Sequence, residues 1–483
     1  MIDSSEPMIK RLRPRRSTNK SEPSTSQSQQ PIESPQKESL NSSSLLYLND
    51  DCLQEIFERL DIIDLCNMAN VCKRCRSITM RIFSQRSDEL VLKGLWSSYE
   101  LRRILCTFGH LIKSIDTSKA FIRTMDRQNF NASGIVKYCT ENLEAISLKR
   151  MTINCEAFKL LFERLKCIKL FECNFIGNKN DLFKKCPNLE TFSFHADFLD
   201  AGPNGDYDIP IDFVVQKFRK LKFLGFDCNF TGARTFFTLL KLNRHIKHID
   251  IAAQSEDQFI DAIVKYTKNL ESFAIHSGDS GPEEQTLEGF LKLSKLKMLQ
   301  KLKIESQCEE GYAEWVGPLM DAFDNEMVPI NHLELIDFQI ATDDIKSILK
   351  LKTLKFLYLN SIVKGVSDAD LVPLATQLPL LEYLQLEFDY ELKTPITAND
   401  LVAMAKNSEQ LTFIALVCVQ NLKIDQNAFE AILKAVKSRH HGKKLTIEIV
   451  GCSNQTSIFD VPDNVQRAAS PYLKIKYSEP SDE

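Results

Sequence analysis

Apolar residues recur through most of the chain with one fixed spacing. An apolar residue is followed by two positions of any kind, a second apolar residue, one further position and a third apolar residue. The copies are Leu143-Ile146-Leu148, Leu165-Ile168-Leu170, Leu189-Phe192-Phe194, Leu221-Leu224-Phe226, Ile246-Ile249-Ile251, Leu270-Phe273-Ile275, Leu299-Leu302-Ile304, Ile330-Leu333-Leu335, Leu354-Leu357-Leu359, Leu381-Leu384-Leu386 and Leu411-Ile414-Leu416, with Ile112-Ile115 as a weaker first copy. Because successive side chains of a strand point to opposite faces, the last two apolar residues of each copy share a face. The spacing predicts a short strand with one buried face in every copy.

The copies begin 22 to 32 residues apart and fill residues 112–452. That interval holds one strand, one turn and one helix, and we expect helices at 156–164, 257–268 and 427–437. About 12 such units stack into a leucine-rich-repeat solenoid with strands inside and helices outside. The predicted fold class is therefore α/β, an irregular horseshoe, with Gly202 to Gly205 and Gly278 to Pro282 as projecting loops.

Before the repeats, within residues 45–85, apolar residues follow the spacing of α-helices. The first predicted helix buries Leu53, Ile56, Phe57 and Leu60 at the spacing of one helix face. The second, capped by Asp64, buries Leu65, Met68, Ala69 and Cys72, and the third buries Cys75, Ile78 and Ile82. Three short helices make a very small core. We therefore expect this module to dock its spare apolar surface elsewhere.

The remaining segments flank these two patterned regions. Residues 1–44 are dominated by Ser, Pro, Gln, Lys and Glu, which predicts a disordered tail. Its basic cluster from Lys10 to Arg16 is consistent with a nuclear-import signal or with a solvated charge run. We expect residues 86–111 to be a linker and the N-terminal cap of the solenoid, and residues 453–483 to be a polar C-terminal tail.

Composition narrows the class of protein. The net charge of -4 over 483 residues gives no basic field for nucleic acid, so no nucleic-acid partner is predicted. No window approaches the roughly 18 consecutive apolar residues of a membrane-spanning helix, so no membrane partner is predicted. The 14 cysteines are scattered without regular pairing, which favours a reducing compartment, cytoplasm and/or nucleus.

The positions between the apolar residues of each copy point to the inner, concave side and stack in columns from one repeat to the next. One column comprises Ala145, Cys167, Thr191, Phe223, His248, Ser272, Lys301, His332, Phe356, Tyr383 and Phe413. Its last three members are aromatic, and Tyr358 lies in the neighbouring column. Contiguous exposed aromatic residues suggest a target-binding patch. Two alternatives are that the C-terminal tail covers these rings or that the strands are misaligned.

The helical module resembles an F-box. The segment Leu48-Asn49-Asp50-Asp51-Cys52-Leu53-Gln54-Glu55-Ile56-Phe57-Glu58-Arg59-Leu60, followed by Asp64-Leu65 and Val71-Cys72-Lys73-Arg74, carries the resemblance. With the repeats behind it, the chain resembles F-box/leucine-rich-repeat proteins from about residue 45 to 450. It departs from the family at Asn49, where proline is usual, and at Cys75, where tryptophan is common; loss of that large anchor would weaken adaptor binding.

The resemblance implies binding to a Skp-type adaptor and, through it, to a cullin. The residues carried over as adaptor-facing or adaptor-supporting are Leu48, Leu53, Ile56, Leu60, Leu65, Val71 and Cys72. Each of them could instead be an internal core residue. In so small a module, core and interface share residues.

The implied function is a substrate-recognition subunit of an SCF-type ubiquitin ligase whose concave face binds an unknown target protein for ubiquitination. The alternatives are an F-box adaptor that does not direct degradation and a regulator of a small GTPase. No catalytic, cofactor or metal site is expected, because Cys72 and Cys75 provide only half of a zinc site and no nucleophile motif is present.

Overall fold

The computed structural model divides the chain into two compact units, Met1–Asn49 and Asp50–Glu483. The first unit is described only at residues 47–49, so the expected disordered tail and its basic cluster lie outside the described residues. The expected loops at Gly202 to Gly205 and Gly278 to Pro282 do so as well. The described segments are 47–86, 88–123, 130–139, 141–195, 212–227, 233–253, 257–277, 286–305, 315–362, 365–388, 395–420, 422–451 and 458–478.

Three helices open the second unit, as the apolar period predicted. They are α1 (Asp50–Phe57), α2 (Ile62–Ala69) and α3 (Lys73–Arg86). The predicted cap of α2 is wrong by three residues: Asp61 is the N-cap, and its Oδ1 accepts a hydrogen bond from the backbone N–H of Asp64 at 2.8 Å. Either aspartate could serve as a cap by residue type, and the earlier one is used because α2 begins at Ile62.

The C-terminal end of α1 is capped by a side chain from α3. Arg86 donates from Nη1 to the backbone oxygen of Leu60 at 2.9 Å, and from Nη2 to the oxygen of Phe57 at 3.3 Å and to that of Glu58. The last carbonyls of a helix lack partners within the helix, and a cation suits the negative end of its dipole. One guanidinium therefore ties α1 to the end of α3.

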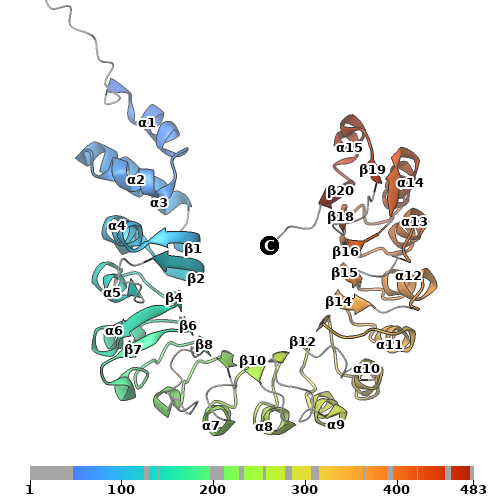
Figure 1. Cartoon of the computed structure of the whole chain (residues 1–483), viewed down its shortest axis with the longest axis horizontal. Helices are drawn as coiled ribbons and strands as arrows, with labels where there is room; N and C mark the ends of the chain where they lie inside the picture. Colours follow the sequence, from blue (N-terminus) through green and yellow to red (C-terminus); the bar gives the residue numbers. More distant parts are fainter. Residues whose placement is uncertain are drawn as a thin grey trace, which may run out of the picture. The chain divides into compact units, whose positions relative to one another are not determined.

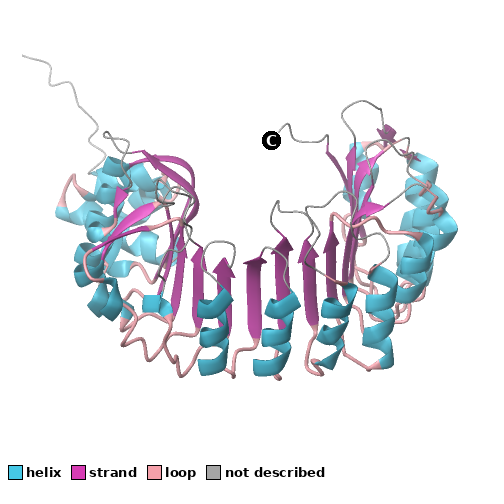
Figure 2. Ribbon diagram, turned by 60° about the horizontal axis from the view of Figure 1, so that its bottom comes forward, coloured by secondary structure: helices cyan, strands magenta, loops and turns pink. Residues whose placement is uncertain are grey.

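One continuous sheet of 15 strands follows, in the order β1-β2-β4-β6-β8-β9-β10-β11-β12-β13-β14-β15-β16-β18-β20. Its strands are β1 (Glu89–Ser97), β2 (Ser114–Arg123), β4 (Ala145–Lys149), β6 (Cys167–Phe171), β8 (Thr191–His195), β9 (Phe223–Asp227), β10 (His248–Ala253), β11 (Ser272–Ser277), β12 (Lys301–Glu305), β13 (His332–Ile336), β14 (Phe356–Ile362), β15 (Tyr383–Phe388), β16 (Phe413–Val419), β18 (Leu445–Gly451) and β20 (Leu473–Ser478). Neighbouring strands are parallel and lie side by side (Figure 2). The sheet runs through the whole repeat region.

Helices connect successive strands and cover one face of the sheet within the unit Asp50–Glu483, so that the strands line the inner side of a curved ribbon (Figure 1). The α-helices are α4 (Ser98–Phe108), α5 (Ser133–Tyr138), α6 (Cys155–Phe162), α7 (Ala233–Leu242), α8 (Asp257–Tyr266), α9 (Leu287–Leu291), α10 (Val316–Asn325), α11 (Thr342–Ile348), α12 (Asp368–Thr376), α13 (Ala398–Asn407), α14 (Gln426–Lys437) and α15 (Asp463–Ala469). Two small parallel sheets join β3 (Phe130–Asn131), β5 (Met151–Asn154) and β7 (Asn174–Ile176), and β17 (Lys423–Asp425) and β19 (Ile458–Asp460). Short 3-10 turns occupy Gly109–Leu111, Lys179–Asp181, Asp212–Val214 and Lys292–Lys295.

The apolar residues of the repeat pattern form the core between sheet and helices. In the copy of β14, for example, Leu354, Leu357 and Leu359 are all fully buried. Phe356 and Tyr358, which alternate with these leucines on β14, are only half-buried, as the strand period requires. The predicted α/β leucine-rich-repeat solenoid, preceded by a three-helix module, is confirmed.

No helix among the described residues has the length and apolar character to cross a bilayer.

The segment 86–111, expected to be a linker and cap, contains the first strand and helix of the array. β1 pairs in parallel with β2, and α4 begins with a capping box in which Ser97 and Glu100 exchange hydrogen bonds. The repeat pattern missed this unit because β1 buries only two leucines, Leu90 and Leu92, and lacks the leading apolar residue. The sheet thus starts one unit earlier than the pattern indicates.

The C-terminal region also differs from the expected polar tail. Residues 458–478 contain β19, α15 and β20, and β20 pairs in parallel with β18 over Leu445 to Val450. Leu473 and Ile475 are buried, although their lysine neighbours make the segment polar on average. Alternating apolar and charged residues are typical of an edge strand with one solvated face.

The three-helix module packs directly on the first repeat helix. The ring of Phe83 on α3 stacks on the ring of Phe108 on α4, with 4.4 Å between centroids and 4° between planes. Asn67 on α2 accepts a hydrogen bond from Arg103 on α4. The spare apolar surface of the small module is thus partly covered by the solenoid.

Candidate functional site

The residues carried over as the adaptor-binding set differ in exposure. Leu53 and Leu65 are buried in the core, at 0% and 1% exposed, so they support the helices from inside. Ile56 is 39% exposed and Val71 58% exposed. These two apolar side chains, on α1 and just before α3, can contact a partner without rearrangement of the module.

The other members of the set are intermediate or lie in the first unit. Leu48 is 37% exposed, while Leu60 and Cys72 are half-buried and pack against the core. The thiol of Cys72 accepts a hydrogen bond from the backbone N–H of Cys75 at 3.4 Å, and this contact lowers its pKa. Cys75 is buried, which raises the pKa of its thiol. Cys75 thus fills an internal position of α3.

The aromatic column predicted on the concave face is assembled by the parallel register of the strands. His332, Phe356, Tyr383 and Phe413 are paired in sequence across β13, β14, β15 and β16. Their rings stack with centroid separations of 4.0, 4.2 and 4.7 Å and interplanar angles of 7°, 9° and 3°. We call these four residues the aromatic ladder. All four are half-buried on the concave face, so the ring edges meet the solvent.

Hydrogen bonds orient Tyr383 of the ladder and Tyr358 of the neighbouring column. Tyr358 donates its hydroxyl to Glu387 at 2.8 Å, and Tyr383 donates to Gln385 at 2.7 Å. Burial and the hydrogen bond to Glu387 raise the pKa of Tyr358. These bonds fix the ring orientations because both partners lie on the strands themselves.

The histidine at the end of the ladder has a carboxylate partner on its own strand. The ring of His332 contacts Glu334 through Nε2 at 2.6 Å, and this contact lowers the pKa of the Glu334 carboxyl. Glu334 is therefore ionised at neutral pH and places a negative charge beside the rings. The patch combines apolar ring edges with anionic groups.

The sequence left two alternatives for the aromatic column, misaligned strands and coverage by the C-terminal tail, and the strand register bears on both. The strand pairs place the four rings in one line, so the strands are aligned as the pattern predicted. The described C-terminal strand β20 extends the sheet beside β18 rather than lying over the ladder. Residues 452–457 and 479–483 are outside the described residues.

A charged cluster occupies the middle of the concave face, and the sequence analysis missed it. His276 on β11 contacts Asp250 on β10 at 3.1 Å and Glu305 on β12 at 2.8 Å. Lys303 reaches Glu305 at 3.0 Å. The hydrogen bond to Asp250 is the main reason that the pKa of His276 is raised. These residues lie two and four places after the column residue of each strand, so reading those further columns would have found them.

Comparisons with known proteins agree with this organisation at the F-box. Residues 45–83 match the F-box domain family. No curated protein sequence matches the chain. Among solved structures, an internalin (inlF) from Listeria monocytogenes is similar over 68% of this chain and 86% of its own, with 17% identity and a TM-score of 0.37.

A structure of the Rad7 and Elc1 complex in yeast is also similar, over 52% of this chain and 74% of the other, with 15% identity and a TM-score of 0.30. At such TM-scores neither likeness carries an inference about function. The F-box match and the strand–helix repeats that follow it nevertheless agree with the helices and the sheet described above. The chain therefore contains an F-box domain at residues 45–83, followed by a parallel strand–helix array that carries the leucine-rich repeat pattern.

Proposed function

We propose that this chain is the substrate-recognition subunit of an SCF-type E3 ubiquitin ligase. An F-box domain implies binding to a Skp-type adaptor, and the adaptor would connect the chain to a cullin. The repeat array would then hold a target protein on its concave face for ubiquitination. In this assignment the chain supplies binding and no catalysis, and it acts by raising the effective concentration of the target near the conjugating enzyme.

The observation that carries the proposal is the F-box at residues 45–83, with Ile56 and Val71 exposed on its surface. Exposed apolar side chains on a small module are typical anchors of a protein interface. We propose the cytoplasm and/or the nucleus as the location, since the partner ligase machinery works there.

The aromatic ladder is the proposed target contact, together with Tyr358. Aromatic side chains are enriched at binding hot spots, because they bring a large apolar area at a low cost in conformational entropy. The stack and the Tyr358–Glu387 hydrogen bond pre-organise this surface before the target arrives.

The test is affinity capture of three forms of the full chain from cells, with mass spectrometry of the co-captured proteins. The intact chain should recover adaptor, cullin and target. Ile56→Asp combined with Val71→Asp should lose adaptor and cullin while keeping the target. Phe356→Ala combined with Tyr383→Ala and Phe413→Ala should keep adaptor and cullin while losing the target. Absence of a cullin from every form would refute the ligase assignment.

A protein-lifetime experiment then separates the ligase from an F-box adaptor that does not direct degradation. After protein synthesis is blocked, the target identified by capture should persist longer in cells with the Ile56→Asp, Val71→Asp form than in cells with the intact chain. An unchanged lifetime would instead support the non-degradative adaptor.

A further inference from the structure

The first two strands of the sheet are longer than the strands that follow them. β1 has 9 residues and β2 has 10, whereas β4 and β6 have 5 each. The β1–β2 pairing contains an irregularity between Val91 and Lys93 and then continues to Ser97 and Arg123. The two strands therefore carry a paired extension that β4 does not reach.

The concave side of these two strands exposes three large apolar side chains. Val91 is 49% exposed, Leu95 56% and Phe121 58%, while Leu90 and Leu92 point to the core. Leu95 and Phe121 are direct partners in the parallel register. Val91 pairs with Asp116 and is separated from Leu95 and Phe121 by the Lys93–Lys119 pair, so the adjacent apolar centre is Leu95 with Phe121. Adjacent apolar side chains with such exposure are uncommon on a folded protein unless they bind something. We call Val91, Leu95 and Phe121 the β1–β2 patch.

Cations surround this patch. Lys93 on β1 and Lys119 and Arg123 on β2 are exposed, and none of the three forms an ion pair with the described part of the chain. The guanidinium of Arg150 lies 5.8 Å from the centre of the Phe121 ring, in addition to its ion pair with Glu172. The patch therefore joins an apolar centre to a rim that is cationic around Leu95 and Phe121 and carries one carboxylate, Asp116, beside Val91.

The backbone of β1 offers a further binding feature. β1 is the terminal strand of the main sheet, so no strand of the described chain pairs with its outer edge. The edge of a sheet can add an extended segment through main-chain hydrogen bonds, and side chains then select the sequence. Lys93 is well placed to select an anionic side chain because it lies on this edge strand.

We propose that the β1–β2 patch binds an extended segment of a partner protein that carries acidic residues between apolar ones. Charge identifies this occupant: the cationic rim attracts carboxylates, whereas a second copy placed symmetrically on the same patch would oppose cation to cation. The apolar centre favours a protein segment over nucleic acid, whose binding rests mainly on phosphate contacts. This surface is separate from both the F-box contact and the aromatic ladder.

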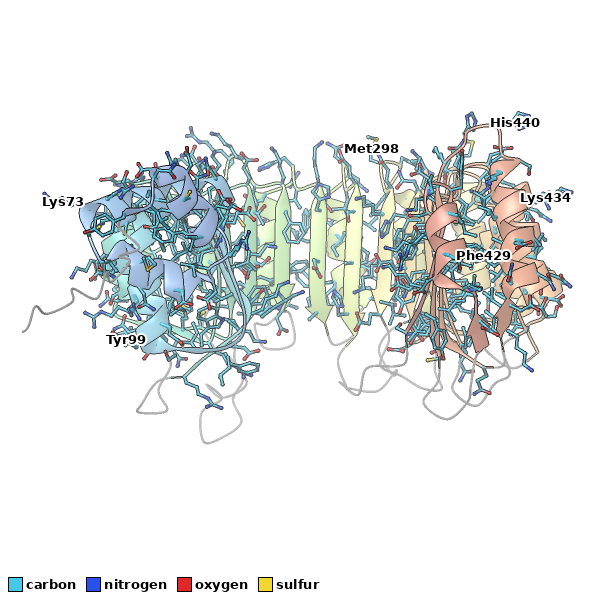
Figure 3. The ribbon with its side chains drawn as sticks, turned by 90° about the horizontal axis from the view of Figure 1, so that it is seen from above. Lys73, Tyr99, Met298, Phe429, Lys434 and His440 are labelled. Atoms are coloured by element: carbon cyan, nitrogen blue, oxygen red, sulfur yellow. The ribbon has the colours of Figure 1, made fainter. Side chains whose placement is uncertain are left out.

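The test measures fluorescence anisotropy of the full chain with three labelled probes. The first is a short peptide in which Glu alternates with Val, the second is the same peptide with Gln in place of Glu, and the third is a single-stranded DNA oligonucleotide. The charge variant is Lys93→Glu with Arg123→Glu, and the apolar variant is Leu95→Ser with Phe121→Ser. Lys434→Glu and Leu160→Ser are the matched controls. Both are exposed on outer helices, and Lys434 lies at the opposite end of the array (Figure 3).

The proposal predicts that the Glu peptide binds about tenfold more tightly than the Gln peptide and that this difference shrinks at high salt. The charge variant should bind the Glu peptide about tenfold or more weakly than the intact chain does. The apolar variant should also bind this peptide more weakly, at low and at high salt alike. The two controls should bind as the intact chain does. Equal binding of the two peptides, unchanged binding by both patch variants, or preference for the DNA probe would each overturn the proposal. The F-box and ladder assignments do not depend on this result.

Discussion

The ring of Tyr383 lies between the rings of Phe356 and Phe413 and parallel to both, at 4.2 and 4.7 Å between centroids. Tyr383 is thus the only one of these three residues with both of its ring faces covered by the other two. Replacing it by Ala removes two stacked contacts, one with Phe356 and one with Phe413, and leaves Phe356 stacked on His332 alone. The repeat pattern brings these rings together from three different strands, so the stack also links repeats.

We expect Tyr383→Ala to lower the free energy of unfolding by about 2–3 kcal/mol, from two ring contacts and lost apolar burial. Denaturant unfolding followed by circular dichroism measures this change. The matched control is Tyr99→Ala, since Tyr99 is 68% exposed on α4, and its effect should stay within about 0.5 kcal/mol. Equal effects of the two substitutions would show that the stack adds no stability.

Asn243 is a fully buried amide that joins three parts of the backbone. Its Oδ1 accepts from the N–H of Phe218 at 2.7 Å, and its Nδ2 donates to the oxygens of Gln216 and Leu239 at 2.8 and 2.9 Å. Asn243→Ala leaves these groups without partners, so it should cost about 2–4 kcal/mol of unfolding free energy. Asn142→Ala, which removes one exposed hydrogen bond to His110, should cost less than about 1 kcal/mol in the same assay. A cost for Asn243→Ala no greater than that of Asn142→Ala would contradict this role.

Arg86 should control the stability of the F-box through the end of α1. Arg86→Ala removes charged hydrogen bonds to the oxygens of Leu60, Phe57 and Glu58, which together stabilise by about 1.5–3 kcal/mol. Amide hydrogen exchange within α1 should accelerate by about tenfold or more. Arg81→Ala, at an exposed position of the same helix α3, should leave the exchange of α1 unchanged. If both variants exchange alike, the cap does not stabilise α1.

Two histidines of the concave face, His276 and His195, should have pKa values shifted in opposite directions. Hydrogen bonding to Asp250 raises the pKa of His276 above its ordinary value, whereas burial lowers the pKa of His195. A raised folded-state pKa means that protonated His276 stabilises the fold below about pH 6.5, and this contribution is lost as the pH rises through the folded-state pKa. Glu305 and Lys303 also face His276, with opposite effects on its pKa.

Nuclear magnetic resonance titration of the imidazole protons measures the pKa values of His276 and His195. Asp250→Asn should lower the pKa of His276, because it removes the carboxylate that does most to raise this pKa. A pKa of His276 that is below its ordinary value, or that does not respond to Asp250→Asn, would show that the carboxylate does not control this ring.

The repeat spacing was sufficient to predict the concave columns. In a parallel array one register position repeats on each strand, so the spacing alone aligns Phe356, Tyr383 and Phe413. β1 could not be found in this way, because Leu90 and Leu92 alone do not complete the pattern. Two apolar residues in alternation occur in many segments that are not repeat strands.

The split of the adaptor set was not predictable from the sequence. Leu53 and Ile56 both fit the apolar spacing of α1, yet Leu53 is buried and Ile56 is 39% exposed. The boundary between the buried and the exposed face of a helix depends on which neighbours pack against it. The hydrogen bonds of Arg86 to the end of α1 and of Asn243 to Phe218 were missed for a related reason. Their partners lie far away in the sequence, and residue type gives no signal for contacts of that kind.

The most direct test of the central claim is binding of the purified full chain to a purified Skp-type adaptor from the same organism, measured by isothermal titration calorimetry. We predict a one-to-one complex for the intact chain and for Lys434→Glu. Ile56→Asp combined with Val71→Asp should weaken the complex by at least about tenfold, because both side chains are exposed anchors, while the melting temperature stays unchanged. No complex with the intact chain, or an equally tight complex with the double variant, would contradict the account of the F-box surface.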